Sequence, residues 1–308
     1  MAGIGLISNP FSKKNRKNPR RLNKIKNLLP DQNLACFPTS FEEMDAAMAV
    51  FKKEDIDILA VNGGDGTIHI ALSSLCKVYG DKKLPKLAIL KGGTMNQTAT
   101  ASKIKGDTFE IFGNVCRKYS KKESFLFETK PLIKIDDKYG FIFGNGVVCN
   151  FMDIYHEGGD PSPFVALKSL LKVVFSMVVK GAVAKKLFAP LNMEIIADKF
   201  SFGYQPYMAM ILASISEVGL GFELLPRAAG SIQSFQMVAL KDKSKIVREI
   251  PRVWLGRALP CDVADDVTGR EFIIKAQRPF RYTLDGDIYN SSGTLKIECG
   301  PLIDIIME

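Results

Sequence analysis

The pattern of apolar and polar positions divides the chain into two parts. In the first third, near-continuous apolar runs of the kind found in strands buried on both faces of a parallel sheet occur at 4–8, 56–61 and 87–90. Apolar residues at helical spacing occur between these runs, at 41–53 and 68–79, and a basic helix is expected around 20–29. Ser40 and Glu43 have the spacing of a capping box at the start of the 41–53 helix. This alternation predicts an open, mostly parallel α/β sheet with right-handed crossovers.

After about residue 120 the pattern changes to many short strands with few helices. The expected strands are 132–135, 140–149, 193–200, 207–215, 234–240, 271–276, 280–284 and 294–299. The first two flank a predicted hairpin turn at 136–139, and 164–188 is a basic amphipathic helical stretch. We therefore predict an α/β domain at 1–125 and a β-rich, sandwich-like domain at 126–308, with the extreme C-terminus free to pack back on the first domain.

Composition limits the class of protein. The six cysteines form no Cys-x-x-Cys pair and there are only two histidines, so we expect buried or half-buried free thiols in a reducing compartment rather than a zinc site. No charged segment precedes the apolar start, which argues against a signal peptide. No apolar run reaches the roughly 20 residues that a membrane-spanning helix needs. The sequence thus predicts a cytoplasmic protein whose membrane contact is peripheral.

The net charge of +9 is unevenly distributed. Between Lys13 and Lys26 the chain carries eight lysines and arginines and no acid, and such a stretch attracts nucleotide phosphates, anionic lipid or nucleic acid. A solvated helix face is the structural alternative. Nucleic acid is disfavoured because no recognition motif and no stacking aromatic side chains accompany the charges.

The most informative segment, 61–67, reads Val-Asn-Gly-Gly-Asp-Gly-Thr and lies between a predicted buried strand and a predicted helix. Its glycines let the backbone approach a ligand closely, and phosphates bind at the carboxyl end of such a strand. The Gly-Lys-Ser/Thr ending of a Walker A loop is absent. Asp65 would repel a phosphate unless Mg²⁺ lay between them or the carboxylate acted as a base. The alternative is a tight turn of structural use alone.

Two more polar loops follow apolar runs. Gly92-Gly93-Thr94-Met95-Asn96 follows the strand at 87–90, and the first strand ends at Ser8, Asn9 and Ser12. If these strands are parallel, all three loops line one edge of one sheet and form a single site.

Taken together, GGDGT at 63–67, GTMN at 93–96, NPFS at 9–12 and DGD at 285–287 resemble the diacylglycerol kinase catalytic family, which includes bacterial lipid kinases and the sphingosine kinases. The resemblance covers nearly the whole chain. GGDGT alone is shared with NAD kinases and phosphofructokinase relatives, and the added GTxN spacing favours the lipid-kinase branch.

This resemblance implies an ATP-binding α/β domain, a β-rich lipid-binding domain and a cleft between them. It implies that Asp65 acts with Mg²⁺ on the nucleotide and is a catalytic candidate. Asp287 takes the place of the family's glutamate, the proton acceptor, and is one methylene shorter. Ser40 falls where the family has a nucleotide-contacting threonine, although Thr39 could serve after a one-residue shift. The implied ATP contacts are Asn9, Ser12, Ser40, Gly63, Gly64, Asp65, Gly66, Thr67, Gly93, Thr94 and Asn96.

Some positions depart from the family pattern. Lys13 replaces a glycine, and 229–232 lacks the acidic residue that helps bacterial members to hold a structural metal. The leading hypothesis is an ATP-dependent kinase that phosphorylates diacylglycerol, a sphingoid base or a related lipid at an anionic membrane surface. The basic helix at 164–188 would contact that surface. The alternatives are an NAD kinase-like enzyme, whose usual Asn-Glu motif is not evident, and a non-catalytic nucleotide- and lipid-binding relative. A homodimer is left open.

Overall fold

The computed structural model describes residues 3–93, 96–157, 187–216, 223–228, 232–241 and 243–307. The chain divides into two compact units. Unit 1 comprises Met1–Leu132, Asp137–Gly140 and Pro301–Glu308, and unit 2 comprises Ile133–Asp136 and Phe141–Gly300. The chain therefore leaves unit 1, returns to it briefly at 137–140, and returns again at its C-terminal end.

Unit 1 is built on a parallel sheet in the order β2-β1-β3-β4. Its strands are β1 (Ile4–Ser8), β2 (Ala35–Cys36), β3 (Ile58–Asn62) and β4 (Lys86–Ile89). The end of β16 (Thr294–Ile306) lies beside β4, where Ile305 pairs with Leu87 in parallel. All residues of β1 and β3 are buried, as their near-continuous apolar sequence predicts.

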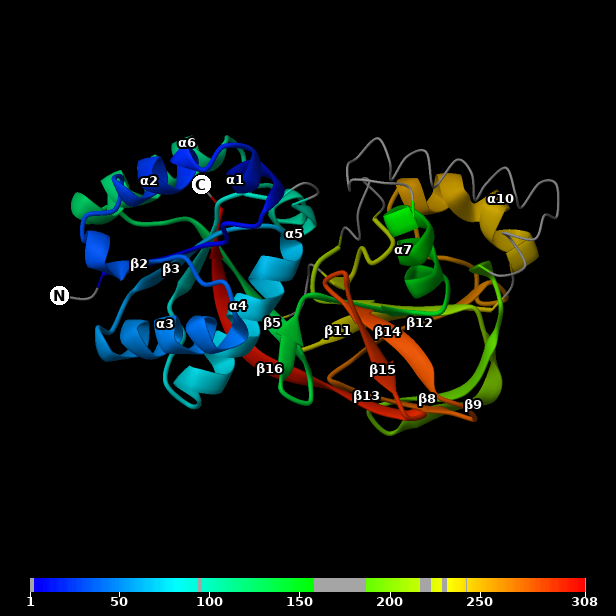
Figure 1. Cartoon of the computed structure of the whole chain (residues 1–308). Coiled ribbons are helices and arrows are strands. Elements are labelled where there is room, and N and C mark those ends of the chain that lie inside the picture. The colour runs from blue at the N-terminus through cyan, green and yellow to red at the C-terminus, as the bar shows by residue number, and fades with distance from the viewer. Residues whose placement is uncertain are drawn as a thin grey trace. The chain divides into compact units, whose positions relative to one another are not determined.

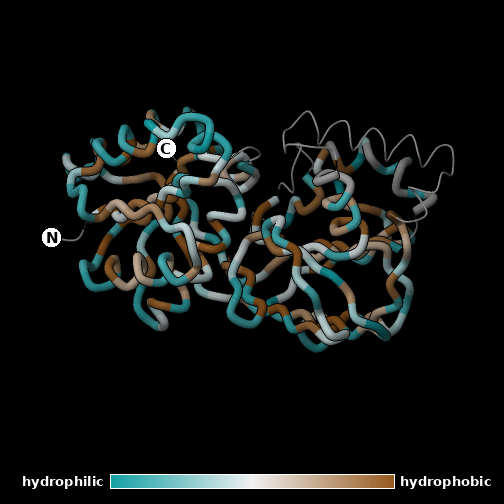
Figure 2. Tube along the Cα trace, in the orientation of Figure 1, coloured by the Kyte–Doolittle hydropathy of each residue, from teal (hydrophilic) through white to brown (hydrophobic). Residues whose placement is uncertain are grey.

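Helices cover both faces of this sheet (Figure 1). They are α1 (Lys13–Lys17), α2 (Arg20–Lys26), α3 (Phe41–Lys53), α4 (Asp65–Tyr79), α5 (Gln97–Ala101) and α6 (Thr108–Ser120), with a 3₁₀ turn at Gln32–Leu34. On one face α2 meets α6, where the Arg21 guanidinium lies 4.5 Å from the centre of the Phe109 ring. On the other face α3 meets α4, where Ser74 Oγ donates to Asp45 Oδ1 over 2.6 Å. Figure 2 shows α1 and α2 largely hydrophilic, while hydrophobic residues gather on the strands between the helix layers.

The start of α3 differs from the predicted capping box. Ser40 Oγ accepts from the Glu43 amide over 3.2 Å, as expected of an N-cap. The Glu43 carboxylate, however, accepts from the amide and hydroxyl of Thr39, at 2.7 and 2.8 Å. It therefore holds the residue before the cap, and only half of the predicted box is present.

Unit 2 contains two antiparallel sheets. The first has six strands: β12 (Ala264–Gly269), β11 (Phe235–Leu240), β10 (Ala209–Ala213), β7 (Ile142–Asn145), β14 (Phe280–Leu284) and β15 (Asp287–Ser291), in this order. The second is formed by β16, β13 (Glu271–Ala276), β8 (Leu191–Ala197) and β9 (Phe200–Tyr207). Buried residues of both sheets, among them Phe143, Met210, Ile195 and Phe272, form one hydrophobic core.

The remaining elements are β5 (Phe127–Ile135), β6 (Lys138–Gly140), α7 (Val147–Glu157) and α10 (Lys243–Trp254). The predicted fold class, a mostly parallel α/β domain followed by a β-rich domain, is confirmed. The strand predicted for 140–149 is wrong in its second half, because Val147–Cys149 begin α7. The helix predicted for 164–188 lies outside the described residues except at its end. In the described ranges, no helix is long and apolar enough to cross a bilayer.

Candidate functional site

Three loops meet at the carboxyl edge of the parallel sheet in unit 1. β1 pairs with β3 as far as Ser8 and Asn62, and β3 pairs with β4 as far as Val61 and Ile89. The Asn9 amide then donates to the Asn62 carbonyl over 3.0 Å. The loops that begin at residues 9, 63 and 90 therefore leave the sheet from the same edge, as the strand pattern predicted.

Glycines allow two of these loops to touch through their backbones. A Cβ on Gly93 would stand 2.3 Å from the Cα of Gly64, and a Cβ on Gly92 would stand 2.3 Å from Asn62 Oδ1. A Cβ on Gly63 would stand 2.3 Å from the Cβ of Thr67. Real Cβ atoms do not approach other atoms this closely, so the three glycines are required by the packing of the loops.

The GGDGT motif forms the beginning of α4. This helix starts at Asp65, three residues earlier than the sequence pattern predicted, and Gly64 is its N-cap. Gly64 offers no side chain to cap the helix, so the first-turn amides receive no side-chain hydrogen bond from the cap position. The positive end of the helix dipole adds to these amides. Such a helix start favours an anionic group, above all phosphate.

Asp65 is tied to the second glycine loop. Its Oδ1 accepts from the amide of Thr98 over 3.1 Å and from the Thr98 hydroxyl over 3.3 Å. Thr98 lies in the first turn of α5, whose N-cap, Asn96, makes no capping hydrogen bond with its own side chain. The Asp65 carboxylate thus caps α5, which is a structural role that sequence reasoning missed. That Asp65 binds Mg²⁺ together with the nucleotide stays a prediction.

The other predicted contact residues hold the loops in shape. Asn9 Nδ2 donates to Thr67 Oγ1 over 2.8 Å, which connects the first loop to the GGDGT motif. Asn96, with a left-handed φ of 50°, accepts from the Gly93 amide over 3.0 Å through Oδ1. Ser12 is buried, and its hydroxyl has no hydrogen-bond partner in the described part of the chain.

Ser40 and Thr94 were also predicted to contact ATP. Ser40 caps α3, so its hydroxyl is engaged with its own helix. Thr94 lies outside the described residues. The nucleotide-binding roles of both residues stay predictions.

A buried amide network lies beneath the loops and was not foreseen. Asn62, 1% exposed, donates through Nδ2 to Ser8 Oγ over 2.7 Å and to Asn15 Oδ1 over 3.4 Å. Asn15 Nδ2 donates to the Asn9 carbonyl over 2.8 Å. The sequence signal that could have indicated this network was Asn62, a polar residue at the end of a fully buried strand. Asn62 Oδ1 is buried without a hydrogen-bond partner among the described residues.

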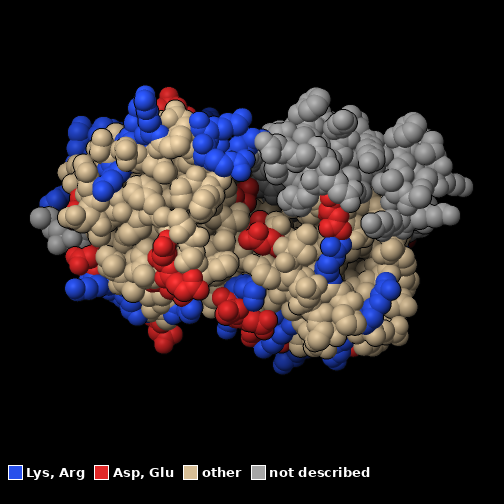
Figure 3. Space-filling view, in the orientation of Figure 1, with Lys and Arg blue, Asp and Glu red and all other residues tan. Residues whose placement is uncertain are grey.

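Positive charge accompanies the second loop. Lys14 Nζ donates to the Lys91 carbonyl over 2.8 Å, and Lys91 has a left-handed φ of 50°. Although much of Lys14 is exposed, desolvation of its ammonium group and then the neighbouring Arg21 hold its pKa below the usual value, while Asp107 opposes this shift. Figure 3 shows lysines and arginines gathered over α1 and α2. These two basic helices correspond to the basic stretch seen in the sequence.

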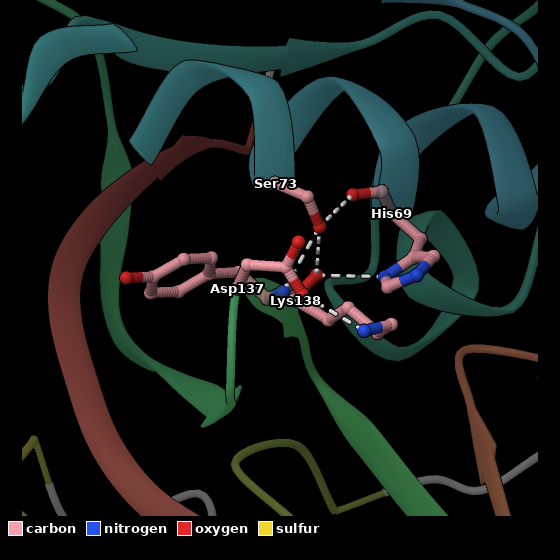
Figure 4. Close-up of polar contacts among 5 residues, drawn as sticks. His69, Ser73, Asp137 and Lys138 are labelled. Atoms are coloured by element: carbon pink, nitrogen blue, oxygen red, sulfur yellow. Dashed lines mark hydrogen bonds and ion pairs between the residues drawn. The ribbon is translucent and has the colours of Figure 1, made fainter. Parts of the chain in front are cut away.

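The body of α4 holds strand β6, as Figure 4 shows. The Nδ1 atom of buried His69 lies 2.8 Å from the Tyr139 carbonyl. Ser73 Oγ accepts from the Tyr139 amide and donates to the His69 carbonyl, both over 2.9 Å. Both polar groups of the Tyr139 backbone are therefore fixed to the helix that begins with GGDGT.

Asp287 belongs to unit 2, where it begins β15 and pairs with Leu284 of β14. The turn predicted for the DGD segment is present, with Asp285 and Gly286 at its two central positions. Their φ angles of 50° and 96° are those of a two-residue hairpin turn with both central residues in the left-handed region.

The fold and these loops place unit 1 among α/β proteins that present glycine-rich loops at the carboxyl edge of a parallel sheet. Residues 3–125 match the family model of the diacylglycerol kinase catalytic domain. The resemblance deduced from the sequence motifs is thereby confirmed.

The whole chain also resembles solved structures. A diacylglycerol kinase from Bacillus anthracis str. Sterne is 13% identical with a TM-score of 0.66, covering 99% of this chain and 97% of the other. A structure of a candidate diacylglycerol kinase from the same strain is 15% identical over the same shares, with a TM-score of 0.73. At such identities the likeness shows the fold alone. The search among curated proteins found no match.

Proposed function

We propose that this protein is an ATP-dependent kinase that phosphorylates a hydroxyl group of a lipid such as diacylglycerol or a sphingoid base. The observation that carries the proposal is the junction of two glycine loops at the start of α4. Gly64 and Gly93 touch there, and the helix start is not capped by the side chain of its N-cap residue. The match of residues 3–125 to the diacylglycerol kinase catalytic domain supports the same reaction class.

The residues at this junction fit the phosphates of ATP. The glycines keep side chains out of a backbone cradle, and the first-turn amides of α4 supply donors for phosphate oxygens. Lys14 and Lys91 add positive charge at the second loop. We propose that the nucleotide is held by Asn9, Ser12, Ser40, Gly63–Thr67, Gly93, Thr94 and Asn96.

The same junction fits Mg²⁺ that arrives with the nucleotide. Among the described residues, no group of three or more His, Cys, Asp or Glu side chains could hold a metal ion. Magnesium is commonly held by only one or two carboxylates together with substrate phosphates, and Asp65 can supply one carboxylate. When bound, the ion would neutralise charge on the transferred phosphoryl group.

For the acceptor side, we propose that Asp287 takes the proton of the lipid hydroxyl. A general base must come within about 2.6–3.2 Å of that hydroxyl, directly or through one water. The lipid would be met at an anionic membrane surface on the cytoplasmic side, and the net charge of +9 favours that encounter.

The proposal is tested by phosphate transfer from labelled ATP with magnesium. Mixed micelles would present diacylglycerol, a sphingoid base and related lipid alcohols, and NAD would be offered separately. Asp65→Asn and Asp287→Asn serve as variants, and Asp198→Asn, a carboxylate at another turn of unit 2, serves as the control. Labelled lipid that disappears in the first two variants but persists in the third supports a lipid kinase and identifies its substrate class.

Other outcomes would assign the protein to a different functional class. Label on NAD would make it an NAD kinase-like enzyme. ATP binding without transfer to any acceptor would favour a non-catalytic nucleotide- and lipid-binding protein. Failure to bind ATP at all would refute the proposal, since the loop geometry is its foundation.

A further inference from the structure

The turn that carries Asp287 is fastened to the start of β7 by Asp285. The Asp285 amide donates to the Ile142 carbonyl over 2.9 Å. In return, Asp285 Oδ1 accepts from the amides of Phe141 and Ile142, at 3.0 and 2.8 Å, and Oδ2 lies 3.0 Å from the Phe141 amide. One residue thus makes hydrogen bonds to two successive peptide groups of a neighbouring strand. Hydrogen bonds in which an acceptor is ionised are stronger than neutral ones.

The segment that receives these bonds is itself held in place. Ile142 begins β7, which is paired with β10 and β14 within unit 2. The partner of the Asp285 carboxylate is therefore an anchored strand rather than a loop.

The hairpin also restricts the backbone of residue 287. Leu284 and Asp287 pair with each other, so the two central residues of the turn lie between a pair of hydrogen-bonded strands. The left-handed φ of Asp285 is a conformation that aspartate tolerates better than most residues. We infer that Asp285 is a positioning residue, whose carboxylate fixes the backbone from which Asp287 reaches the acceptor. This inference rests on the proposed kinase function only for its catalytic consequence.

Unit 2 provides a matched control at Asp198. This residue also follows a strand, has a left-handed φ of 50°, and donates its amide to the Glu271 carbonyl over 2.8 Å. Its Oδ1 accepts from the amides of Arg270 and Glu271, at 3.0 and 2.9 Å. The same hydrogen-bond arrangement therefore occurs at the β8–β9 turn, which carries none of the family motifs.

The experiment compares Asp285→Ala and Asp285→Asn with Asp198→Ala and Asp198→Asn. Both alanine variants should lower Tm by similar amounts. Only Asp285→Ala should also lower kcat, by about 10–100-fold, because small displacements of a reacting group have effects of this size. Its KM for ATP should stay unchanged, and Asp285→Asn, which keeps one acceptor oxygen, should recover part of the loss.

Hydrogen exchange supplies a readout that does not require turnover. In Asp285→Ala the amides of 141–142 and 287–289 should exchange faster than in the wild type, whereas in Asp198→Ala they should not. If the wild-type protein transfers no phosphate to a lipid, the proposed function fails, and hydrogen exchange alone decides whether Asp285 positions the turn.

Two results would overturn the inference. One is unchanged exchange at 287–289 in Asp285→Ala. The other concerns the pH profile of kcat. If the decrease in kcat at acid pH is lost in Asp285→Ala but kept in Asp287→Asn, then Asp285 is itself the proton acceptor.

Discussion

The carboxylate of Asp65 receives both the amide and the hydroxyl of Thr98, so one side chain from the GGDGT motif fixes the first turn of the helix after the second glycine loop. The two loops are thus joined twice, once by this cap and once by the contact between Gly64 and Gly93. The acid that suggested phosphate chemistry in the sequence has a structural function, and substitution can test whether it also has the predicted chemical one.

Asp65→Asn and Asp65→Ala make that separation. Asparagine keeps a carbonyl oxygen that can cap α5, so the free energy of unfolding should fall by less than about 0.5 kcal/mol. Alanine removes the cap, and a loss of about 0.5–2 kcal/mol is expected. Phosphate transfer should fall by at least about 100-fold in both variants if the charge of Asp65 serves the nucleotide and its metal. Urea denaturation and the transfer assay measure the two effects. Full activity in Asp65→Asn would show that capping is the only role of this residue.

Gly93→Ala should disrupt the loop junction, because its Cβ would stand 2.3 Å from the Cα of Gly64. We expect a loss of about 1–3 kcal/mol in the free energy of unfolding, together with weaker ATP binding. Gly64→Ala is the control, since a Cβ there would meet only the Gly93 Cα, at 3.4 Å. Its loss in the free energy of unfolding should be clearly smaller. Calorimetry would check the stability of both variants, titration with ATP would check the binding by Gly93→Ala, and equal losses of stability would contradict the packing described.

Acid should weaken the attachment of α3 to α4. Hydrogen bonds from Lys77 and then Ser74 hold the pKa of Asp45 below its usual value. Asp45 therefore contributes stability above the unfolded-state pKa near 4, and the contribution is lost as the pH falls through the lower native value. Lys77 is exposed, so solvent screens the pair and its contribution at pH 7 should be small.

A double-mutant cycle with Asp45→Asn and Lys77→Gln measures this coupling. The coupling energy should be present at pH 7 and absent once Asp45 is protonated in the native state. A coupling that grows on acidification would have the wrong sign and would reject the explanation.

The thiols should differ in their reactivity. Burial raises the pKa of Cys76 to about 12 and that of Cys116 to about 12, so both are protonated at neutral pH and enclosed in unit 1. Cys261 is exposed. Brief treatment of the native protein with iodoacetamide should therefore modify Cys261 first, and mass spectrometry would identify the site. Cys261→Ser should remove the rapid adduct, whereas rapid labelling of Cys76 would indicate that α4 is not packed as described.

The sequence predicted the parallel sheet well because its strands are buried on both faces. Such strands read as apolar runs, and both the run at 56–61 and β3 at Ile58–Asn62 end beside the same glycines. The start of α4 was placed three residues late because glycine disfavours helix interiors, whereas here Gly66 lies in the first turn. Local helix propensity could not show that the first turn of α4 is also part of the glycine-rich loop.

Unit 2 was less predictable because its elements depend on tertiary contacts. β9 was not predicted as a separate strand, since it contains Gly203 and Pro206 and its residues are mostly exposed. Val147 and Val148 favour a strand by propensity but begin a helix. Gly144 contributes to this, because a Cβ there would stand 2.8 Å from Val148 Cγ1, so the helix packs closely on β7.

The candidate site was predicted as a set of motifs rather than as a geometry. The glycines and Asp65 were found because their residue types are unusual after a buried strand. The network around Asn62, the cap on Thr98 and the bond from Lys14 to Lys91 were missed, since each joins residues far apart in the sequence. The hydrogen bonds from the amides of Phe141 and Ile142 to the Asp285 carboxylate were missed for the same reason.

The path of β16 has a consequence for how the protein is made. This strand pairs with β13 in unit 2 and then passes beside β4 and β5, where Thr129 Oγ1 donates to Asp304 Oδ1 over 2.7 Å. On the ribosome, domains generally fold as units in the order of their synthesis. Unit 1 cannot do so completely, because the segment of β16 that flanks β4 follows unit 2 in the chain. Unit 1 should therefore mature only after unit 2 has been synthesised, with β4 exposed as an unpaired edge until then.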